Sequence, residues 1–197
     1  MFRFFENLID PYQPYDEDAE FPDRLIPFYL RFLWPARWVI GASMLLSLIF
    51  ALTEAALARF AGQIVDLLSV ADPATVWADH GPAFMGMAAV VFLLRPAVRI
   101  LEAFVSGQGF YAQMGALIRW RTHRKMLRQS LSFFTDDFAG RIANKQLQLA
   151  PALNDSVHQV TSEVWYALIF LPGAAAILAE TDLRLLIPLG LWFAGFV

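Results

Sequence analysis

Long apolar runs alternate with polar segments along most of the chain. Residues 39–57 contain one charged side chain, Glu54, and residues 83–94, 164–179 and 185–197 are also strongly apolar. The first run is close to the ~20 residues that an α-helix needs to cross the hydrocarbon core of a bilayer. The pattern therefore predicts an all-α fold, a polytopic membrane helix bundle. We expect its helices at about residues 36–68, 82–131, 141–179 and 183–197.

The second and third predicted helices are longer than their apolar runs, and the polar surplus lies between those two runs. This part of the sequence is the most basic, with Arg119, Arg121, Arg124, Lys125 and Arg128. Cytoplasmic loops of membrane proteins carry an excess of Lys and Arg, so we place this region and the N-terminus in the cytoplasm. Both helices are expected to extend into the cytoplasm, where a loop at residues 132–142 joins them.

The N-terminal residues divide into two expected segments. Residues 1–23 are predicted to form an irregular tail, because prolines at positions 11, 14 and 22 break helices and neighbouring acids repel each other. Residues 24–35 are amphipathic, which favours an elbow helix along the membrane surface that ends at Pro35. A direct N-terminal extension of the first membrane helix is the alternative. Residues 36–197 are assigned to the membrane domain.

Four charged residues interrupt the first two predicted membrane helices: Glu54, Arg95, Arg99 and Glu102. Charged groups are costly in lipid, so they face protein or a water-filled cavity. Arg99 and Glu102 have the i, i+3 spacing of an ion pair on one helix face. With Pro82 as the first residue of the second helix, Glu54 falls near the outer edge and Arg95 past the midplane, which argues against a direct pair. The four residues fit either a polar translocation pathway or structural ion pairs.

Two further patterns predict close helix packing. Apolar residues recur every three to four positions along the second helix, as in a packed seam, at Leu117, Trp120, Leu127, Leu131 and Phe134. Gly107 and Gly109 lack the lysine of a phosphate-binding loop, and in an apolar helix they favour close packing of another helix.

Composition supports the membrane assignment and narrows the chemistry. The 197 residues are 58% hydrophobic and 17% charged, whereas soluble domains average about 45–50% and about 25%. A net charge of −3 gives no reason to expect nucleic acid as a partner. Because the sequence has no cysteine, disulfides, thiolate metal ligands and a Cys nucleophile are excluded.

Catalytic motifs are not found in the sequence. It contains no G-x-x-x-x-G-K-[ST], and therefore no phosphate cradle for ATP. The three histidines, His80, His123 and His158, do not have metal-binding spacing. Asp136 and Asp137 are adjacent, which on a helix is about 100° apart, so they suit a helix cap better than paired acid–base catalysis. We expect no enzymatic activity, cofactor or metal site in this chain.

The stretch RTHRKMLRQSLSFFTDDFAGRIANKQLQ joins the second and third helices, and it resembles the transmembrane domain of ABC exporters of the multidrug and lipid type. In that family, an aromatic pair at the end of helix two is followed by a small residue and glycine, then a basic and an aliphatic residue. The matching positions are Phe133, Phe134, Ala139, Gly140, Arg141 and Ile142. The resemblance covers roughly residues 24–197, the first half of a six-helix type-1 exporter fold that is incomplete here.

The resemblance implies that the loop is a coupling helix that docks on a nucleotide-binding domain, which would hold ATP and Mg²⁺ and is absent from this sequence. The residues implied in coupling are Phe133, Phe134, Asp136, Asp137, Phe138, Gly140 and Arg141. The phenylalanines suit apolar anchors in a partner groove, and a glycine permits a sharp turn.

The resemblance further implies a multi-pass protein of the plasma (inner) membrane, surrounded by lipid, that pairs with an identical or different half-transporter. Its substrate would be apolar or amphipathic. Many relatives have an acidic residue where Arg141 stands, and an Asn/Asp pair further on where this sequence reads NKQLQLAPALND. Helices five and six and the ATP-binding domain are missing, so we expect a fragment or a chain completed by another.

A non-transporting, membrane-anchored adaptor is the alternative function. Its cytoplasmic hairpin would bind a partner. Apart from either function, the alternative to docking by the phenylalanines is that they only pack the tip of the hairpin. The coding sequence after codon 197 distinguishes the two functions, because only an exporter needs further helices and a Walker A motif downstream.

Overall fold

The fold is built from helices. The computed structural model describes residues 2–16, 22–70, 76–136 and 139–196, and within these ranges all regular structure is helical, with no strand. Three helices are long and apolar enough to cross a membrane, at Leu25–Leu67, Val76–Leu127 and Gly140–Thr181, and a shorter apolar helix follows at Leu183–Gly195. The predicted all-α membrane helix fold is confirmed.

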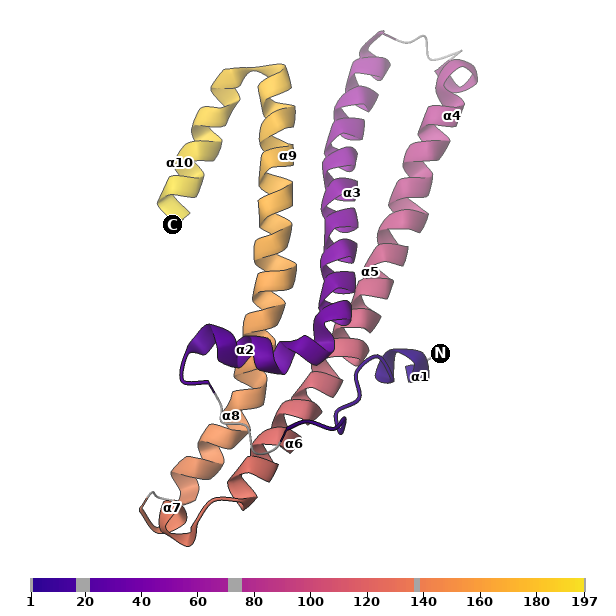
Figure 1. The fold of residues 1–197 in the computed structure, drawn as a ribbon. Coiled ribbons are helices and arrows are strands. Elements are labelled where there is room, and N and C mark those ends of the chain that lie inside the picture. The colour runs from indigo at the N-terminus through magenta and orange to yellow at the C-terminus, as the bar shows by residue number, and fades with distance from the viewer. Residues whose placement is uncertain (1, 17–21, 71–75, 137–138, 197) are drawn as a thin grey trace. The chain divides into compact units, whose positions relative to one another are not determined.

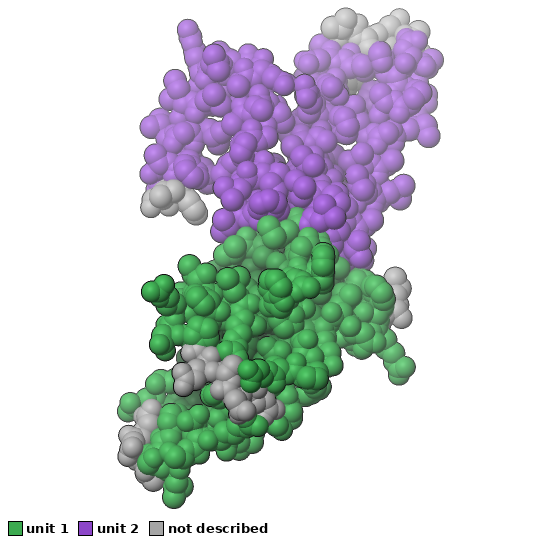
Figure 2. Space-filling view, viewed as in Figure 1, with its two compact units in different colours: residues 1–44, 102–162 green, residues 45–101, 163–197 purple. Residues whose placement is uncertain are grey.

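The chain divides into two compact units (Figure 2). Unit 1 comprises residues 1–44 and 102–162, and unit 2 comprises residues 45–101 and 163–197. The helices within unit 1 are α1 Phe2–Glu6, α2 Leu25–Leu33, η1 Trp34–Ala36, η3 Phe104–Ala112, α6 Gln113–Leu127, α7 Leu131–Asp136 and α8 Ala139–His158. Those within unit 2 are α4 Val76–Ala89, η2 Val90–Leu94, α9 Trp165–Thr181, η5 Leu183–Leu185 and α10 Leu186–Phe196. The boundaries between units fall in α3 Arg37–Val70, α5 Arg95–Ala103 and η4 Gln159–Val164.

Unit 1 is organised around a helical hairpin. Figure 1 shows α6 and α8 side by side, with the short helix α7 at the end where they are joined. Met114, Leu117 and Ile118 of α6 are fully buried, as is Leu153 of α8. Full burial of such a side chain stabilises by about 1.5–3 kcal/mol, so this seam accounts for much of the packing of the hairpin.

The buried seam ends sooner than its sequence spacing predicts. Leu117 is fully buried, but Leu127 is 68% exposed and Leu131 is 81% exposed. Helix α6 stops at Leu127, and a separate helix, α7, starts at Leu131. The helix expected at about 82–131 therefore ends at Leu127, and the buried seam ends before that residue.

The elbow helix α2 is separated from α3 by a 3-10 turn that contains Pro35. A proline removes a backbone donor and disfavours a continuous helix, and the expected break is present. Phe32 is buried, and the Tyr29 hydroxyl lies 3.3 Å from Ser156 Oγ, which fastens α2 to α8. Trp38 remains 78% exposed, as expected for a residue at a lipid–water interface.

The N-terminal segment is more ordered than predicted. Residues 2–6 form helix α1, whereas an irregular tail was expected over residues 1–23. The Phe5 ring stacks on Phe104 with 5.4 Å between ring centroids, and Ile9 is only 3% exposed. Burial of these apolar residues on η3 explains the order, which charge and proline content alone could not indicate. Residues 10–16 have no helix, as expected, and positions 17 and 18 of the acidic run lie outside the described residues.

The second membrane helix begins earlier than predicted. Helix α4 starts at Val76, so Pro82 lies inside it and is not its first residue. Trp77 and Phe84, two turns apart, stack with 6.0 Å between centroids and 5° between planes. This contact stabilises the helical turns before the proline and offsets the missing hydrogen bond.

Helices α9 and α10 form a second hairpin in unit 2, seen in Figure 1. The Asp182 carboxylate accepts the Arg184 backbone N–H at 2.8 Å and thereby caps η5. Aspartate favours this position because its oxygen satisfies a donor that has no intrahelical partner. The turn fixes the point where the apolar chain reverses direction.

Candidate functional site

A charged and aromatic cluster joins α3 and α5 within unit 2. Arg95 Nε donates to Glu54 Oε1 at 2.7 Å. The Arg99 guanidinium lies 3.9 Å from the centroid of the Phe50 ring, within the range of a cation–π interaction. Phe50 and Glu54 are one turn apart on α3, and Arg95 and Arg99 are one turn apart on α5, so each helix presents one face to the other.

Helix α9 adds an aromatic wall to this cluster. The ring centroid of Tyr166 lies 6.0 Å from that of Phe50 and 5.4 Å from that of Phe170, with which it is stacked at 9°. Gly173 lies close to α3, since a Cβ built on it would be 3.7 Å from the Ala55 Cβ. These aromatic residues were not predicted from the sequence. Their i, i+4 spacing with each other, and that of Phe50 with Glu54, was the available signal.

The contacts fix the relative directions of the three segments in unit 2. Phe50 contacts Tyr166 and Arg59 bridges Glu180 at 2.9 Å, so α3 and α9 run parallel. Phe50 precedes Glu54 on α3, but its partner Arg99 follows Arg95, the partner of Glu54, on α5, so α3 and α5 run antiparallel. Helices α3, α5 and α9 therefore alternate in direction, as successive membrane crossings must.

The Glu54–Arg95 ion pair corrects the sequence analysis, which argued against it. The outer edge of the membrane was expected near Glu54, close to the end of the apolar run at residue 57. In the structure, Glu54 lies 16 residues before the end of α3, and Arg95 lies 19 residues after the start of α4. At about 1.5 Å per residue, their levels differ by only about 5 Å. The pairing of Arg99 with Glu102, which lies on α5 in unit 1, stays a prediction.

The tip of the α6–α8 hairpin carries the residues predicted to couple to a partner. Phe133 and Phe134 of α7 are 41% and 36% exposed, and their rings meet edge to face with 5.3 Å between centroids. Gly140 and Arg141 are exposed in the first turn of α8. The two rings are thus only partly covered by the rest of the chain, and their docking to a partner stays a prediction.

Three predicted tip residues are only partly covered by the structure. Asp136 is the last residue of α7, but the placement of its side chain lies outside the described part. Asp137 and Phe138 also lie outside the described residues. Capping by the aspartates and docking by Phe138 therefore stay predictions.

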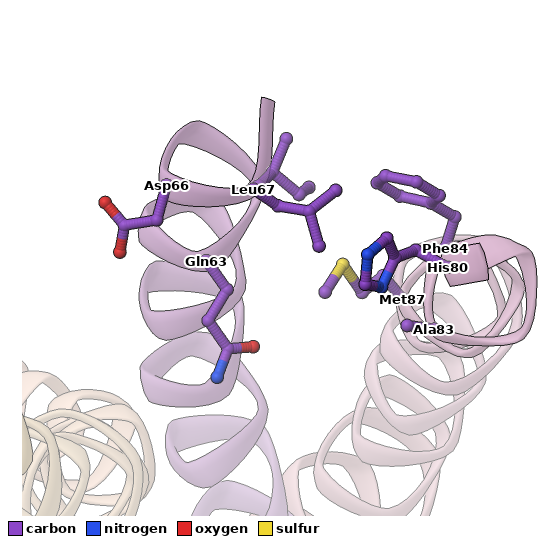
Figure 3. A pocket seen from close by; sticks show the side chains of 8 residues that line it. Gln63, Asp66, Leu67, His80, Ala83, Phe84 and Met87 are labelled. Atoms are coloured by element: carbon purple, nitrogen blue, oxygen red, sulfur yellow. The ribbon is translucent and has the colours of Figure 1, made fainter. Parts of the chain in front are cut away.

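An open cavity of about 460 Å³ lies between α3 and α4 (Figure 3). His80 and Met87 point across it toward Leu67, whereas the Asp66 carboxylate points away. Its walls are mostly apolar. Among the described residues, no group of three or more His, Asp or Glu side chains could hold a metal ion.

Comparison with known proteins gives one informative similarity. The chain is 31% identical, over 202 aligned residues, to an uncharacterized ABC transporter ATP-binding protein of Haemophilus influenzae. The alignment covers all of this chain but 32% of the relative, so the chain spans about a third of that protein's length. No protein-family model and no solved structure matches. The similarity and the apolar helices indicate a membrane protein with a transport-related role.

Proposed function

We propose that this chain is the first part of the transmembrane domain of an ABC exporter. The proposal depends on one observation: a packed hairpin, α6–α7–α8, ends in an exposed aromatic pair, in a chain that is similar along its whole length to an ABC transporter protein. The full protein would export an apolar or amphipathic substrate, with ATP and Mg²⁺ bound by a separate nucleotide-binding domain.

The hairpin suits the transmission of movement from such a domain. Its buried seam, centred on Leu117 and Leu153, makes α6 and α8 a stiff pair. Phe133 and Phe134 would insert into a groove of the nucleotide-binding domain as apolar anchors. Arg141, exposed in the first turn of α8, would pair with an acidic residue of that domain. A displacement of the tip would then move both helices together.

The cluster on α3, α5 and α9 would belong to the transport pathway. Glu54, Arg95 and Arg99 supply charge, with Glu102 one turn further along α5. Phe50 and Tyr166 supply an aromatic surface beside the charges. Such a combination suits a substrate with both apolar and charged parts. A second half-transporter in the plasma (inner) membrane, with cytoplasmic N-termini, would complete the pathway.

The test is made in the full-length transporter. Phe134→Ala, and separately Gly140→Pro, should reduce transport at least severalfold and abolish the stimulation of ATP hydrolysis by substrate, while the protein still reaches the membrane. Leu127→Ala is the matched control, because Leu127 is an exposed apolar residue of α6 outside the tip. Unchanged transport and ATPase stimulation in both tip variants would refute the coupling role. Partner binding that depends on Phe134, in a protein without transport, would instead support the adaptor.

A further inference from the structure

Unit 1 contains a second open cavity, of about 500 Å³, formed by three separate parts of the chain. Helix α6 contributes one face of successive turns, α8 contributes two residues, and the N-terminal segment contributes Tyr12. The lining residues are Tyr12, Ala116, Arg119, Trp120, His123, Gln146 and Leu147. The volume falls in the range of about 300–1,000 Å³ that is usual for small-molecule sites.

The polar lining of this cavity consists of hydrogen-bond donors. Arg119 and His123 lie one turn apart on the same face of α6, and Gln146 faces them from α8. The guanidinium offers five N–H donors, and the imidazole and amide offer more. None of the described residues that line the cavity is acidic. The arrangement favours an anion with several acceptor oxygens, as a phosphate group has.

The apolar part of the lining is aromatic. The Tyr12 and Trp120 rings meet at 82° with 5.3 Å between centroids, and the Arg124 guanidinium lies 5.3 Å from the centroid of the Trp120 ring. The Asp10 carboxylate accepts the Tyr12 backbone N–H at 2.9 Å and so helps to hold Tyr12 in place. A ligand with a ring or aliphatic portion next to its phosphate would use both surfaces.

The position of the cavity favours a ligand from the aqueous phase. A Cβ on Gly109 would lie 3.7 Å from Val39 Cγ1, and Val39 is the first residue of the long apolar run of α3. Arg119 is ten residues beyond Gly109, about 15 Å along the helix. The headgroup layer is only about 5–8 Å thick on each side. Arg119 therefore lies beyond the headgroups for a helix normal to the membrane.

We propose that this cavity binds a small organic phosphate ester, with the phosphate on Arg119, His123 and Gln146 and the organic part against Tyr12 and Trp120. The proposal does not depend on the exporter function, since none of the tip residues Phe133, Phe134 and Arg141 lines the cavity. A phospholipid headgroup carries the same phosphate chemistry, and the experiment must distinguish the two sources.

The test uses the full chain in nanodiscs of zwitterionic phosphatidylcholine, with phenyl phosphate as the probe and calorimetric titration as the readout. We expect saturable binding, tighter than that of inorganic phosphate. Arg119→Gln should weaken it about tenfold or more, since a hydrogen bond to a charged group contributes about 1.5–3 kcal/mol. Gln146→Glu adds a carboxylate on α8 and should abolish phenyl phosphate binding. Helical circular dichroism verifies that each variant is folded.

Lys145→Gln is the matched control. It removes one positive charge from the exposed surface of α8, next to Gln146 but outside the lining, and it should leave binding unchanged. Equal weakening by Lys145→Gln and Arg119→Gln, or no saturable binding at all, would overturn the site. In a second arm, nanodiscs with phosphatidylglycerol are compared. If the protein loses phenyl phosphate binding in these nanodiscs, and the loss depends on Arg119, the site belongs to lipid and the aqueous source is refuted.

Discussion

The ion pair between Glu54 and Arg95 allows a sharp test of the environment of unit 2. We consider the removal of one charge at a time, by Glu54→Gln and Arg95→Gln, and of both charges together. The two groups are joined at 2.7 Å, and each lies in a helix that is apolar and long enough to cross a membrane. Loss of either partner removes the ion pair that compensates the other charge.

The expected cost depends on whether lipid surrounds the pair. An unpaired charge at the centre of a membrane helix costs about 2.5–3.5 kcal/mol. The Arg95 side chain is 46% exposed and that of Glu54 is 21% exposed, so either charged group can extend toward a more polar part of the bilayer. We therefore reduce the cost to about 1–3 kcal/mol, or about 5- to 140-fold in the folding equilibrium. A similar pair in water contributes only about 0–1 kcal/mol.

The assay is reversible unfolding of the wild type, both single variants and the double variant in nanodiscs, analysed as a double-mutant cycle. We expect a coupling energy of at least about 1 kcal/mol, with the double variant more stable than the worse single one. Arg59 and Glu180 provide the control cycle, since they pair at 2.9 Å but are 59% and 60% exposed. A Glu54–Arg95 coupling no larger than that of the control would refute a lipid-enclosed pair.

Two further predictions concern unit 1. A Cβ on Gly109 would lie 3.0 Å from Leu8 Cδ1, whereas nothing lies within 4 Å of one on Gly107. Gly109→Val should therefore reduce the free energy of unfolding by about 1–3 kcal/mol and speed protease cleavage of the N-terminal segment. Equal cleavage in Gly107→Val would contradict this. Leu117→Ala should destabilise the protein by about 2–5 kcal/mol in thermal unfolding, because Leu117 is fully buried. The control, Leu127→Ala, should unfold within about 0.5 kcal/mol of the wild type.

The helices could be predicted from the sequence because apolar runs and prolines act locally. The elbow break at Pro35 is of this kind. Helix ends were less predictable where a contact opposed the local preference. Pro82 is a favourable first residue, yet the stacking of Trp77 on Phe84 extends α4 before it. The order of α1 likewise depends on Phe104, which is about 100 residues away in the sequence.

The candidate sites show the same division. The exposed pair Phe133 and Phe134 could be found because adjacent aromatic residues in a polar stretch are visible in the sequence. The partner of Glu54 could not, because pairing across helices depends on where the second helix begins, and α4 begins at Val76 and not at Pro82. Close helix packing was predicted at Gly107 and Gly109, but a Cβ on Gly107 would meet nothing within 4 Å, and the nearest atom to one on Gly109 belongs to Leu8 of the N-terminal segment.

The two interpretations of the charged residues, a pathway or structural pairs, therefore need not exclude each other. Glu54 and Arg95 hold α3 and α5 together by direct contact, and Arg99 covers Phe50 on the same face. In a transporter that alternates between two states, a contact between two moving helices stabilises one state more than the other. An ion pair in lipid has a large such contribution because its loss leaves two costly charges. Glu54 and Arg95 would then set the balance between states whether or not a substrate touches them.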